Sequence, residues 1–289
     1  MATLRDLKRQ IRSVNNIAKV TEALQTVSAV KFRKAEARVK RARPYAENMQ
    51  QMMRDVARHA RGESPLLAGR EGNNVAIASI TADRGLAGGF NAQVLRRSWQ
   101  LRRERDAEFL QVASGRKAVA FFRFRRIELE AAYTGFSDGP TYEKAREIGH
   151  ALFRLFEDGA ADEVYLVYNR FESALTQRPV LTRLLPVAPE EEDEQGEGDA
   201  SGTFLEYIPD ADTILRELVP RYVETMIWQA LLESAAGEHG ARMTAMKNAT
   251  DNANELAKDL TLEMNKARQA QITREISEIA AGAEALSAG

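Results

Sequence analysis

Residues 243–267 read MTAMKNATDNANELAKDLTLEMNKA, and their apolar and small side chains recur at alternating steps of three and four. The positions of this repeat are Met243, Met246, Thr250, Ala253, Ala257, Leu260, Met264 and Ala267. Such a spacing is a heptad seam, which predicts a helix that packs along a partner helix. Because Ala and Thr are small and Met is adaptable, the seam permits close helix approach but contributes little apolar area per turn.

The helix predicted from this seam is long. Ile272, Ile276 and Ile279 continue the apolar stripe toward the end of the chain, and Asp210 is a candidate N-cap far upstream. At a rise of about 1.5 Å per residue, the stretch from residue 221 to residue 286 would be on the order of 100 Å long. A helix of this length is expected to project from any domain that a chain of 289 residues can build.

A second long helix is predicted over residues 3–61, at the other end of the chain. Its apolar residues form one stripe at steps of three and four: Leu4, Leu7, Ile11, Val14, Ile17, Val20, Leu24 and Val27. The consecutive three-residue steps between Ile11 and Val20 would overwind a strict heptad seam, so a regular coiled coil is not expected there. Pro44 should kink or interrupt this helix, and Pro220 should disturb the C-terminal one. Since each terminus presents one stripe, the two helices are expected to pair as an antiparallel coiled coil.

Between the helices the hydrophobic period changes to that of short strands. Strands are predicted at residues 75–81, 108–113, 127–133 and 164–171, with a further strand within 179–187, and helices at 92–105 and 141–157. Alternating strands and helices indicate a Rossmann-like α/β domain with parallel neighbours. The expected fold class is therefore α/β with a long helical coiled coil. It comprises an N-terminal shaft helix (1–61), a central α/β domain (62–208) and a C-terminal shaft helix (209–289).

The composition excludes several classes of protein. The chain has no cysteine, which excludes disulfides, thiolate nucleophiles and cysteine metal sites. No apolar run approaches the roughly 20 residues of a membrane span, and the N-terminus does not resemble a signal peptide, so a cytoplasmic protein is expected. The net charge is only −1, yet residues 1–62 carry about three basic side chains for each acidic one. Residues 190–202 are strongly acidic and are interpreted as a solvated loop.

No residue pattern nominates a catalytic, cofactor or metal site. The glycine-rich stretch from Asp83 to Asn91 lies where a phosphate-binding loop would sit, but it lacks the G-x-G-x-x-G and G-x-x-x-x-G-K-[ST] spacings. It is interpreted as a tight strand-to-helix turn. His59, His150 and His239 are isolated from one another and belong to no metal-binding motif. We therefore expect no catalytic residue, no cofactor and no metal.

Two stretches of the helices are expected to meet partners. The basic run 31–43 has few aromatic residues nearby, which favours a solvated or protein-facing helix over a nucleic-acid contact without excluding the latter. Residues 265–276 are polar around the whole helix, as expected where partners grip it by hydrogen bonds and ion pairs. Beyond residue 280 the side chains are small and nearly uncharged, which fits either a tip that turns in an apolar sleeve or a frayed end.

The most specific pieces of this sequence resemble the gamma subunit of F-type ATP synthases. These pieces are residues 83–91, 241–252 and 265–279, supported by 27–35, 43–47 and 221–224. The resemblance runs in order from the first residues to the last. It implies a rotor whose antiparallel helices pass up the axis of a hexamer of three alpha and three beta subunits. The lower part of such a rotor would meet the epsilon subunit and the membrane-embedded c-ring.

The resemblance also implies roles for individual residues. By position, the group facing the beta subunit's catch region would be Arg268, Gln269, Thr273 and Glu275. The lower shaft would contain Lys31, Arg33 and Lys34, and the foot near the c-ring would contain Tyr207. Catalysis and nucleotide binding would belong to alpha and beta, so the chain itself would be no enzyme and would bind neither cofactor nor nucleic acid. It would lie peripherally on the cytoplasmic face of the cell membrane, reached only through the complex.

The sequence departs from the family pattern at a few positions. Leu24 and Phe32 stand where methionine is usual, and Ala87 stands where cysteine is frequent, and all three keep apolar character. Two other classes remain as alternatives: a coiled-coil adaptor that binds nucleic acid through the basic helix, and a nucleotide-dependent α/β enzyme with helical arms. Neither alternative explains a polar C-terminal stretch followed by an apolar tip.

Overall fold

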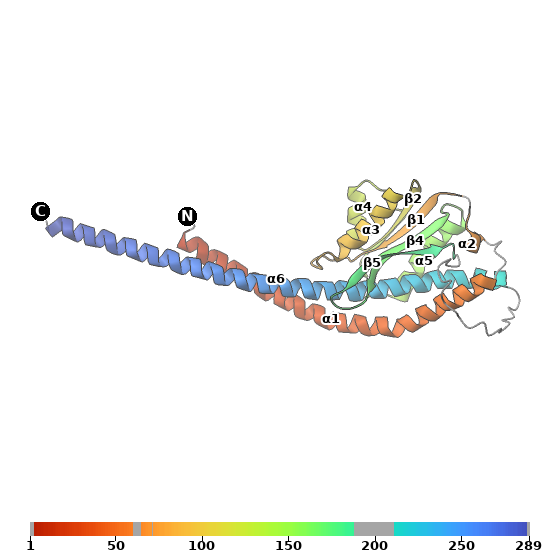
Figure 1. Cartoon of the computed structure of the whole chain (residues 1–289), viewed down its shortest axis with the longest axis horizontal. Helices are drawn as coiled ribbons and strands as arrows, with labels where there is room; N and C mark the ends of the chain where they lie inside the picture. The colour runs from red at the N-terminus through yellow and green to blue at the C-terminus, as the bar shows by residue number, and fades with distance from the viewer. Residues whose placement is uncertain (1–2, 60–64, 71, 188–210, 288–289) are drawn as a thin grey trace, which may run out of the picture. The chain divides into compact units, whose positions relative to one another are not determined.

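The computed structural model describes residues 3–59, 65–70, 72–187 and 211–287 (Figure 1). The chain divides into two compact units. The end unit comprises residues 1–28 and 243–289, and the central unit comprises residues 29–242. Two long helices contribute to both units, namely α1 (Leu4–His59) and α6 (Ala211–Ser287).

A five-stranded sheet is the core of the central unit. Its strands are β1 (Asn74–Ile80), β2 (Glu108–Ser114), β3 (Ala131–Tyr133), β4 (Glu163–Phe171) and β5 (Gln177–Leu185), in the order β3-β2-β1-β4-β5. Figure 1 labels β1, β2, β4 and β5. The short helices are α2 (Pro65–Ala68), α3 (Phe90–Glu104), α4 (Arg116–Phe124) and α5 (Tyr142–Glu157). Neighbours among β1 to β4 run parallel, whereas β5 pairs with β4 antiparallel. The predicted α/β domain is confirmed.

Both faces of this sheet are covered, as is usual for parallel strands. Along β1, Ala76, Ala78 and Ile80 belong to the main hydrophobic core with residues of α1, α5 and α6. Val75 and Ile77 point to the opposite face and pack with residues of α3. The alternation follows from the two-residue period of a strand. The long helices therefore form part of the core of the central unit.

The two long helices pair in antiparallel directions, as predicted. In the central unit, Phe32 of α1 lies beside Gly240 of α6, and Gln50 donates a hydrogen bond to Met226 Sδ. In the end unit, Thr21 Oγ1 lies 2.6 Å from Thr250 Oγ1. The predicted seam positions of α6 are all buried or half-buried, namely Met243, Met246, Thr250, Ala253, Ala257, Leu260, Met264 and Ala267. The coiled coil is confirmed.

The buried stripe of α1 differs from the predicted one, and the expectation of an irregular seam was wrong. The buried and half-buried positions continue at steps of three and four: Leu4, Leu7, Ile11, Val14, Ala18, Thr21, Gln25 and Ser28. The predicted seam residues left outside are Ile17, Val20 and Val27, with exposed fractions of 52%, 59% and 53%. The facing seam of α6 is itself built from small residues, so close helix approach selects small side chains on α1 as well.

Other details of the elements also differ from expectation. Pro44 and Pro220 lie inside continuous helices, so the interruption that Pro44 could have caused does not occur. β3 is shorter than predicted, and α4, which follows Gly115, was not predicted. The candidate cap Asp210 lies outside the described residues. In the described part of the chain, no helix combines the length and the apolar character that a bilayer crossing needs.

Candidate functional site: a collar around helix α6

Helix α6 is enclosed on every side where it crosses the central unit. All residues from Gln229 to Gly240, about three turns, are buried. A surface helix would expose one face in each turn, so other elements must surround this one. We call these elements the collar: the β1–α3 loop with the first residue of α3 (81–90), the β3–α5 loop (134–141), the end of β4 with the β4–β5 turn (171–176) and residues 31–43 of α1.

Two glycines let the collar close onto α6. A Cβ at Gly237 would lie 2.8 Å from Cε2 of Phe90, and a Cβ at Gly240 would lie 3.0 Å from the carbonyl oxygen of Ala174. Glycine inside a helix costs roughly 0.5–1 kcal/mol relative to alanine. At these two positions it permits a close approach, since a side chain would require the neighbouring atoms to move.

A buried ion pair on α6 reaches the β1–α3 loop. Arg242 Nη2 donates to Glu238 Oε1 at 2.5 Å, and Arg242 Nε donates to the carbonyl oxygen of Gly85 at 3.2 Å. The side chains of Arg242 and Glu238 are only 9% and 1% exposed. Burial raises the pKa of Glu238, and the guanidinium of Arg242 opposes that shift. The pair therefore compensates its own buried charges and attaches α6 to the loop.

The carboxylate of Asp138, in the β3–α5 loop, connects both long helices. Its Oδ2 accepts a hydrogen bond from Nζ of Lys31 on α1, and its Oδ1 lies 3.2 Å from Nε2 of His239 on α6. Burial lowers the pKa of His239 to about 4, and the attraction of Asp138 only partly offsets this. The imidazole is therefore neutral near pH 7. Its Nδ1 faces the donor Nη1 of Arg242 at 3.5 Å, which assigns the hydrogen to Nε2, directed at Asp138.

Glu233 is a third polar attachment point of α6. Its Oε2 accepts the backbone N–H of Phe171 at 3.0 Å, and its Oε1 accepts from Nε2 of Gln229 at 2.7 Å. Oε1 also lies 3.6 Å from Nη2 of Arg43 on α1. This buried carboxylate thus binds the end of β4 and the neighbouring helix together.

Asp83 holds the loops of the collar to one another. Its carboxylate accepts backbone N–H groups from Arg116 at 3.0 Å, Gly135 at 2.9 Å and Ser137 at 3.0 Å. Burial by itself would raise the pKa of Asp83, but these hydrogen bonds outweigh it and hold the pKa below its ordinary value. Asp83 therefore holds the β1–α3 loop, the β3–α5 loop and the start of α4 together beside α6.

The collar occupies the sheet edge at which doubly wound folds bind ligands. In the sheet, β2 lies on one side of β1 and β4 lies on the other. The order of the strands therefore reverses at β1, and the carboxyl end of β1 is the topological switch point. Leu231 and Ala235 of α6 and the β3–α5 loop line this crevice, where about 10 Å³ remains beside Thr81 and Gly115. The glycine-rich turn is a tight strand-to-helix connection, as predicted, and the crevice seats a helix where related folds seat a ligand.

Comparisons with known proteins assign the chain to a family. A family model described as ATP synthase matches residues 3–286. The ATP synthase gamma chain of Rubrobacter xylanophilus is 70% identical over 290 residues, which cover 100% of both chains. The chain belongs to the ATP synthase gamma chain family. A second family member, from Pelotomaculum thermopropionicum, is 48% identical and covers 99% of this chain and 100% of its own.

Solved structures of ATP synthases share the fold of this gamma chain family member. A chain of the Euglena gracilis mitochondrial ATP synthase rotor matches with a TM-score of 0.66 at 17% identity, covering 93% of this chain and 98% of that one. A chain of the OSCP/F1/c-ring assembly from the same organism matches with a TM-score of 0.69 at 18% identity, covering 99% and 95%. The resemblance drawn from the sequence is confirmed, and the chain is a part of the ATP synthase complex.

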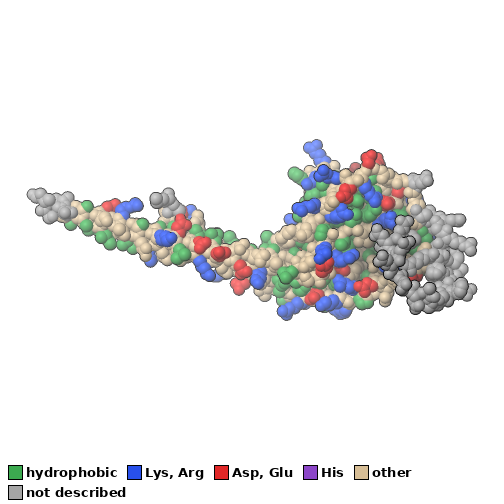
Figure 2. Space-filling view, in the orientation of Figure 1, with side chains coloured by type: hydrophobic (Ala, Val, Ile, Leu, Met, Phe, Trp, Pro, Cys, Tyr) green, Lys and Arg blue, Asp and Glu red, His purple; other side chains and the backbone are tan. Residues whose placement is uncertain are grey.

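The residues expected to face the beta subunit lie on α6 in the end unit. All four of Arg268, Gln269, Thr273 and Glu275 are exposed. Glu275 accepts a hydrogen bond from Nε2 of Gln271 at 2.9 Å within the same helix. Ile272, Ile276 and Ile279 are exposed as well, with fractions of 48%, 61% and 73%, and hydrophobic side chains are visible along the end unit in Figure 2. This stretch thus offers both polar and apolar groups to a partner.

The residues expected in the lower shaft and foot are distributed differently. Lys31 belongs to the collar through Asp138, whereas Arg33 and Lys34 are exposed on α1. Tyr207 lies outside the described residues.

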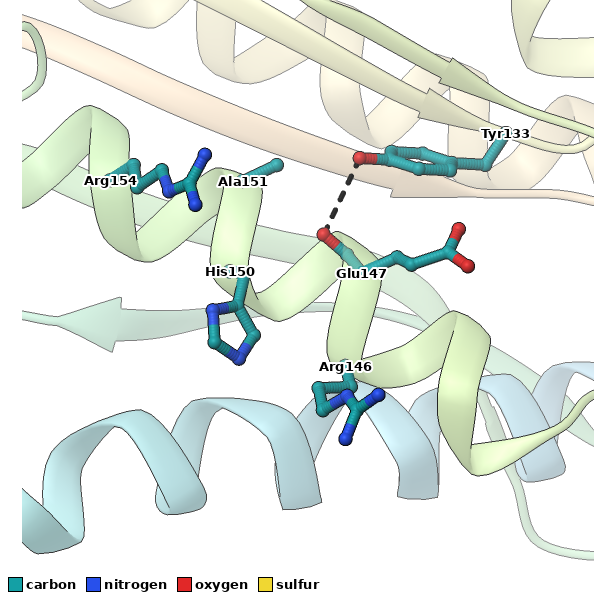
Figure 3. Close-up of a pocket in the computed structure, with 6 residues that line it drawn as sticks. All are labelled: Tyr133, Arg146, Glu147, His150, Ala151 and Arg154. Carbon is teal, nitrogen blue, oxygen red and sulfur yellow. Dashed lines mark hydrogen bonds between the residues drawn. The ribbon is translucent and has the colours of Figure 1, made fainter.

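An open hollow of about 580 Å³ lies between β3 and α5 (Figure 3). It is lined by Tyr133, Arg146, Glu147, His150, Ala151 and Arg154. Tyr133 Oη donates to the carbonyl oxygen of Glu147 at 3.4 Å, and His150 Nε2 lies 3.1 Å from Glu224 Oε1 of α6. His150 and His239 contact different carboxylates, and no cluster of three or more metal-ligating side chains occurs within the described ranges.

Sequence reasoning did not find the collar. Glu238, Arg242 and Asp138 are charged residues in a chain rich in charge, and nothing in the periodicity marks them as buried. The available signal was the pair of glycines, Gly237 and Gly240, inside a predicted helix, since such glycines often mark a close backbone approach.

Proposed function

We propose that this chain is the central rotor shaft of an F-type ATP synthase and has no catalytic site of its own. The observation that carries the proposal is the collar. About three turns of α6 are enclosed by the central unit, and the same helix continues without a break to Ser287. A helix gripped in this way turns with its domain, so rotation applied to one part of the chain is passed along the helix.

Rotation of such a shaft would set the state of the catalytic sites. Ion flow through the c-ring turns the rotor, and its angle decides which of three alpha/beta sites is open. Torque is thereby exchanged for nucleotide affinity. Catalysis and nucleotide binding belong to alpha and beta in this proposal, which the filled crevice at the carboxyl end of β1 supports.

The exposed polar stretch of α6 is proposed to contact the catch region of the beta subunit. The residues concerned are Arg268, Gln269, Thr273 and Glu275. The guanidinium of Arg268 can donate paired hydrogen bonds to a carboxylate, and Gln269 can donate and accept beside it. Because all four side chains are exposed in the free chain, a partner can reach them without rearrangement of the helix.

The remaining partners follow from the same proposal. Arg33, Lys34 and Lys31 belong to the lower shaft and Tyr207 to the foot near the c-ring, with the epsilon subunit beside them. The complex contains three alpha and three beta subunits, and the chain lies on the cytoplasmic face of the cell membrane, bound only through that complex. The division of the chain into an N-terminal shaft helix (1–61), a central α/β domain (62–208) and a C-terminal shaft helix (209–289) stays a prediction. The relatives give no support to a nucleic-acid-binding adaptor.

Affinity purification of the tagged chain from gently solubilised native membranes tests this function. The proposal predicts co-purification of alpha and beta subunits at three copies each, together with epsilon and the c-ring. A chain that is recovered alone, or with nucleic acid, would contradict it. A matched preparation from the soluble fraction controls for non-specific capture.

A further inference from the structure

We propose that three polar contacts between α6 and the collar act as keys that fix the rotational register of the helix and bear torque between helix and domain. The keys are the Glu233 contact with Phe171, the Arg242 contact with Gly85 and the His239 contact with Asp138. The inference rests on the proposed rotor function. Glu233, His239 and Arg242 are positioning residues, since none of them touches a substrate.

The three keys project from α6 in different directions. With 3.6 residues per turn, His239 and Arg242 point roughly 240° and 180° around the helix axis from Glu233. Glu233 meets the end of β4, Arg242 meets the β1–α3 loop and His239 meets the β3–α5 loop. Because all three side chains extend away from the helix axis, rotation of α6 in either sense moves each of them away from its partner.

Between Glu233 and Arg242, the uncharged surface of α6 opposes rotation only weakly. Apart from Glu238 and His239, the residues of this stretch are small, namely Ser234, Ala235, Ala236, Gly237, Gly240 and Ala241, and the larger Leu231 and Leu232 precede it. Small side chains permit close packing but form low ridges, so they oppose rotation about the axis weakly. Hydrogen bonds have defined directions and are lost when the helix turns by a fraction of a residue. In this stretch the register of α6 is therefore set mainly by the polar contacts.

The groups of the collar that bind the three side chains of α6 are themselves held in place. The backbone N–H of Phe171 and the carbonyl of Gly85 belong to a strand end and a tight turn, and Asp138 is also bound by Lys31 of α1. Asp83 ties the β3–α5 loop to the N-terminus of α4 and to the end of β1. Load on the keys is thus passed to the sheet.

Mutation of the keys within the whole complex tests the inference. The variant combines Glu233→Met, Asp138→Ala, Glu238→Gln and Arg242→Met, so that every key loses its hydrogen-bonding partner and no buried charge is left alone. The control is Val39→Ala with Leu232→Ala, two buried apolar residues of α1 and α6 that contact in the same region. Each is assembled with alpha, beta, epsilon and the membrane sector in phospholipid vesicles, and the ion gradient at steady state is measured against the ATP hydrolysed.

The variant without the keys should build a steady-state gradient at least about threefold lower per ATP hydrolysed than the control. Its initial rate of ATP hydrolysis should stay within about twofold of wild type. The threefold loss of gradient corresponds to losing about one net hydrogen bond under load. A gradient equal to that of the control would overturn the inference. If the combined variant fails to assemble, Asp138→Ala alone should still lower the gradient measurably, and an unchanged gradient would overturn the inference equally. Failure of the wild-type chain to bind alpha and beta would instead refute the rotor function.

Discussion

Replacement of Arg242 by methionine should destabilise the central unit strongly, because it leaves a buried carboxylate without its cation. Glu238 is 1% exposed, and Arg242 is 2.5 Å from it. Breaking a buried pair by removing one partner typically costs about 3–5 kcal/mol. The lost hydrogen bond to the carbonyl of Gly85 adds about 1 kcal/mol. Arg242→Met should therefore lower the free energy of unfolding by roughly 5 kcal/mol at pH 7.

Neutralising the orphaned carboxylate should restore part of this loss. Glu238→Gln in the Arg242→Met background should recover about 2 kcal/mol, since an amide is far less costly to bury than a charge. Urea unfolding of the full chain, followed by far-UV circular dichroism, measures both values. Arg221→Met, an exposed change on the same helix, is the matched control and should stay within about 0.5 kcal/mol of wild type. A double variant less stable than Arg242→Met would refute the reasoning.

Three further predictions concern other contacts. Gly237→Ala should lower the free energy of unfolding by about 1–3 kcal/mol, although alanine has the better helix propensity, because the new Cβ would lie 2.8 Å from Phe90. A melting temperature higher than that of wild type would show instead that the Phe90 ring moves aside. His239 has a pKa of about 4 when folded against 6.5 ordinarily, so the unfolded state binds the proton more readily and stability should fall, by on the order of 3 kcal/mol, as pH drops from 6.5 toward 4. His239→Gln should flatten that part of the pH profile of Tm, and an unchanged slope would assign it to other groups. Arg268→Ala with Gln269→Ala should leave Tm unchanged but reduce ion-driven ATP synthesis about tenfold, which corresponds to losing about 1.4 kcal/mol of contact with the beta subunit. A rate of synthesis equal to that of wild type would exclude both residues from that contact.

The heptad seam of α6 could be predicted because its spacing is regular and a long helix leaves few other arrangements. The seam of α1 could be predicted only in part. Large aliphatic residues such as Ile17 and Val20 outweigh Ala18 and Thr21 in any hydrophobicity pattern, yet the small residues are the buried ones. The choice depends on the size of the facing side chains, which is a property of the pair of helices and not of one stripe.

The sheet was predicted well where strands are long and apolar. β1 and β4 are buried on both faces, and their runs rich in Val, Ile, Ala, Leu and Tyr leave little ambiguity. α4 was missed because its start depends on Gly115, whose φ of 91° belongs to the region that favours glycine. A single glycine between two apolar stretches does not show in the sequence that a helix follows it.

The collar could not be predicted from the sequence of α6 alone. Its buried charges are stabilised by groups more than 60 residues away in the chain, such as the N–H of Phe171 for Glu233 and the carbonyl of Gly85 for Arg242. Hydrophobic periodicity treats such charges as exposed. Only tertiary structure brings the two halves of each contact together.

Direct observation of rotation tests the central claim. Because the chain has no cysteine, Ala120→Cys on the exposed side of α4 gives a single attachment point for a bead. The variant chain is assembled with the alpha and beta subunits of the same cell, the complex is fixed to a surface through beta, and ATP is added. A rotor must turn the bead continuously in one direction at a rate that follows ATP concentration. Sustained ATP hydrolysis with a bead that only fluctuates about one angle would contradict the account.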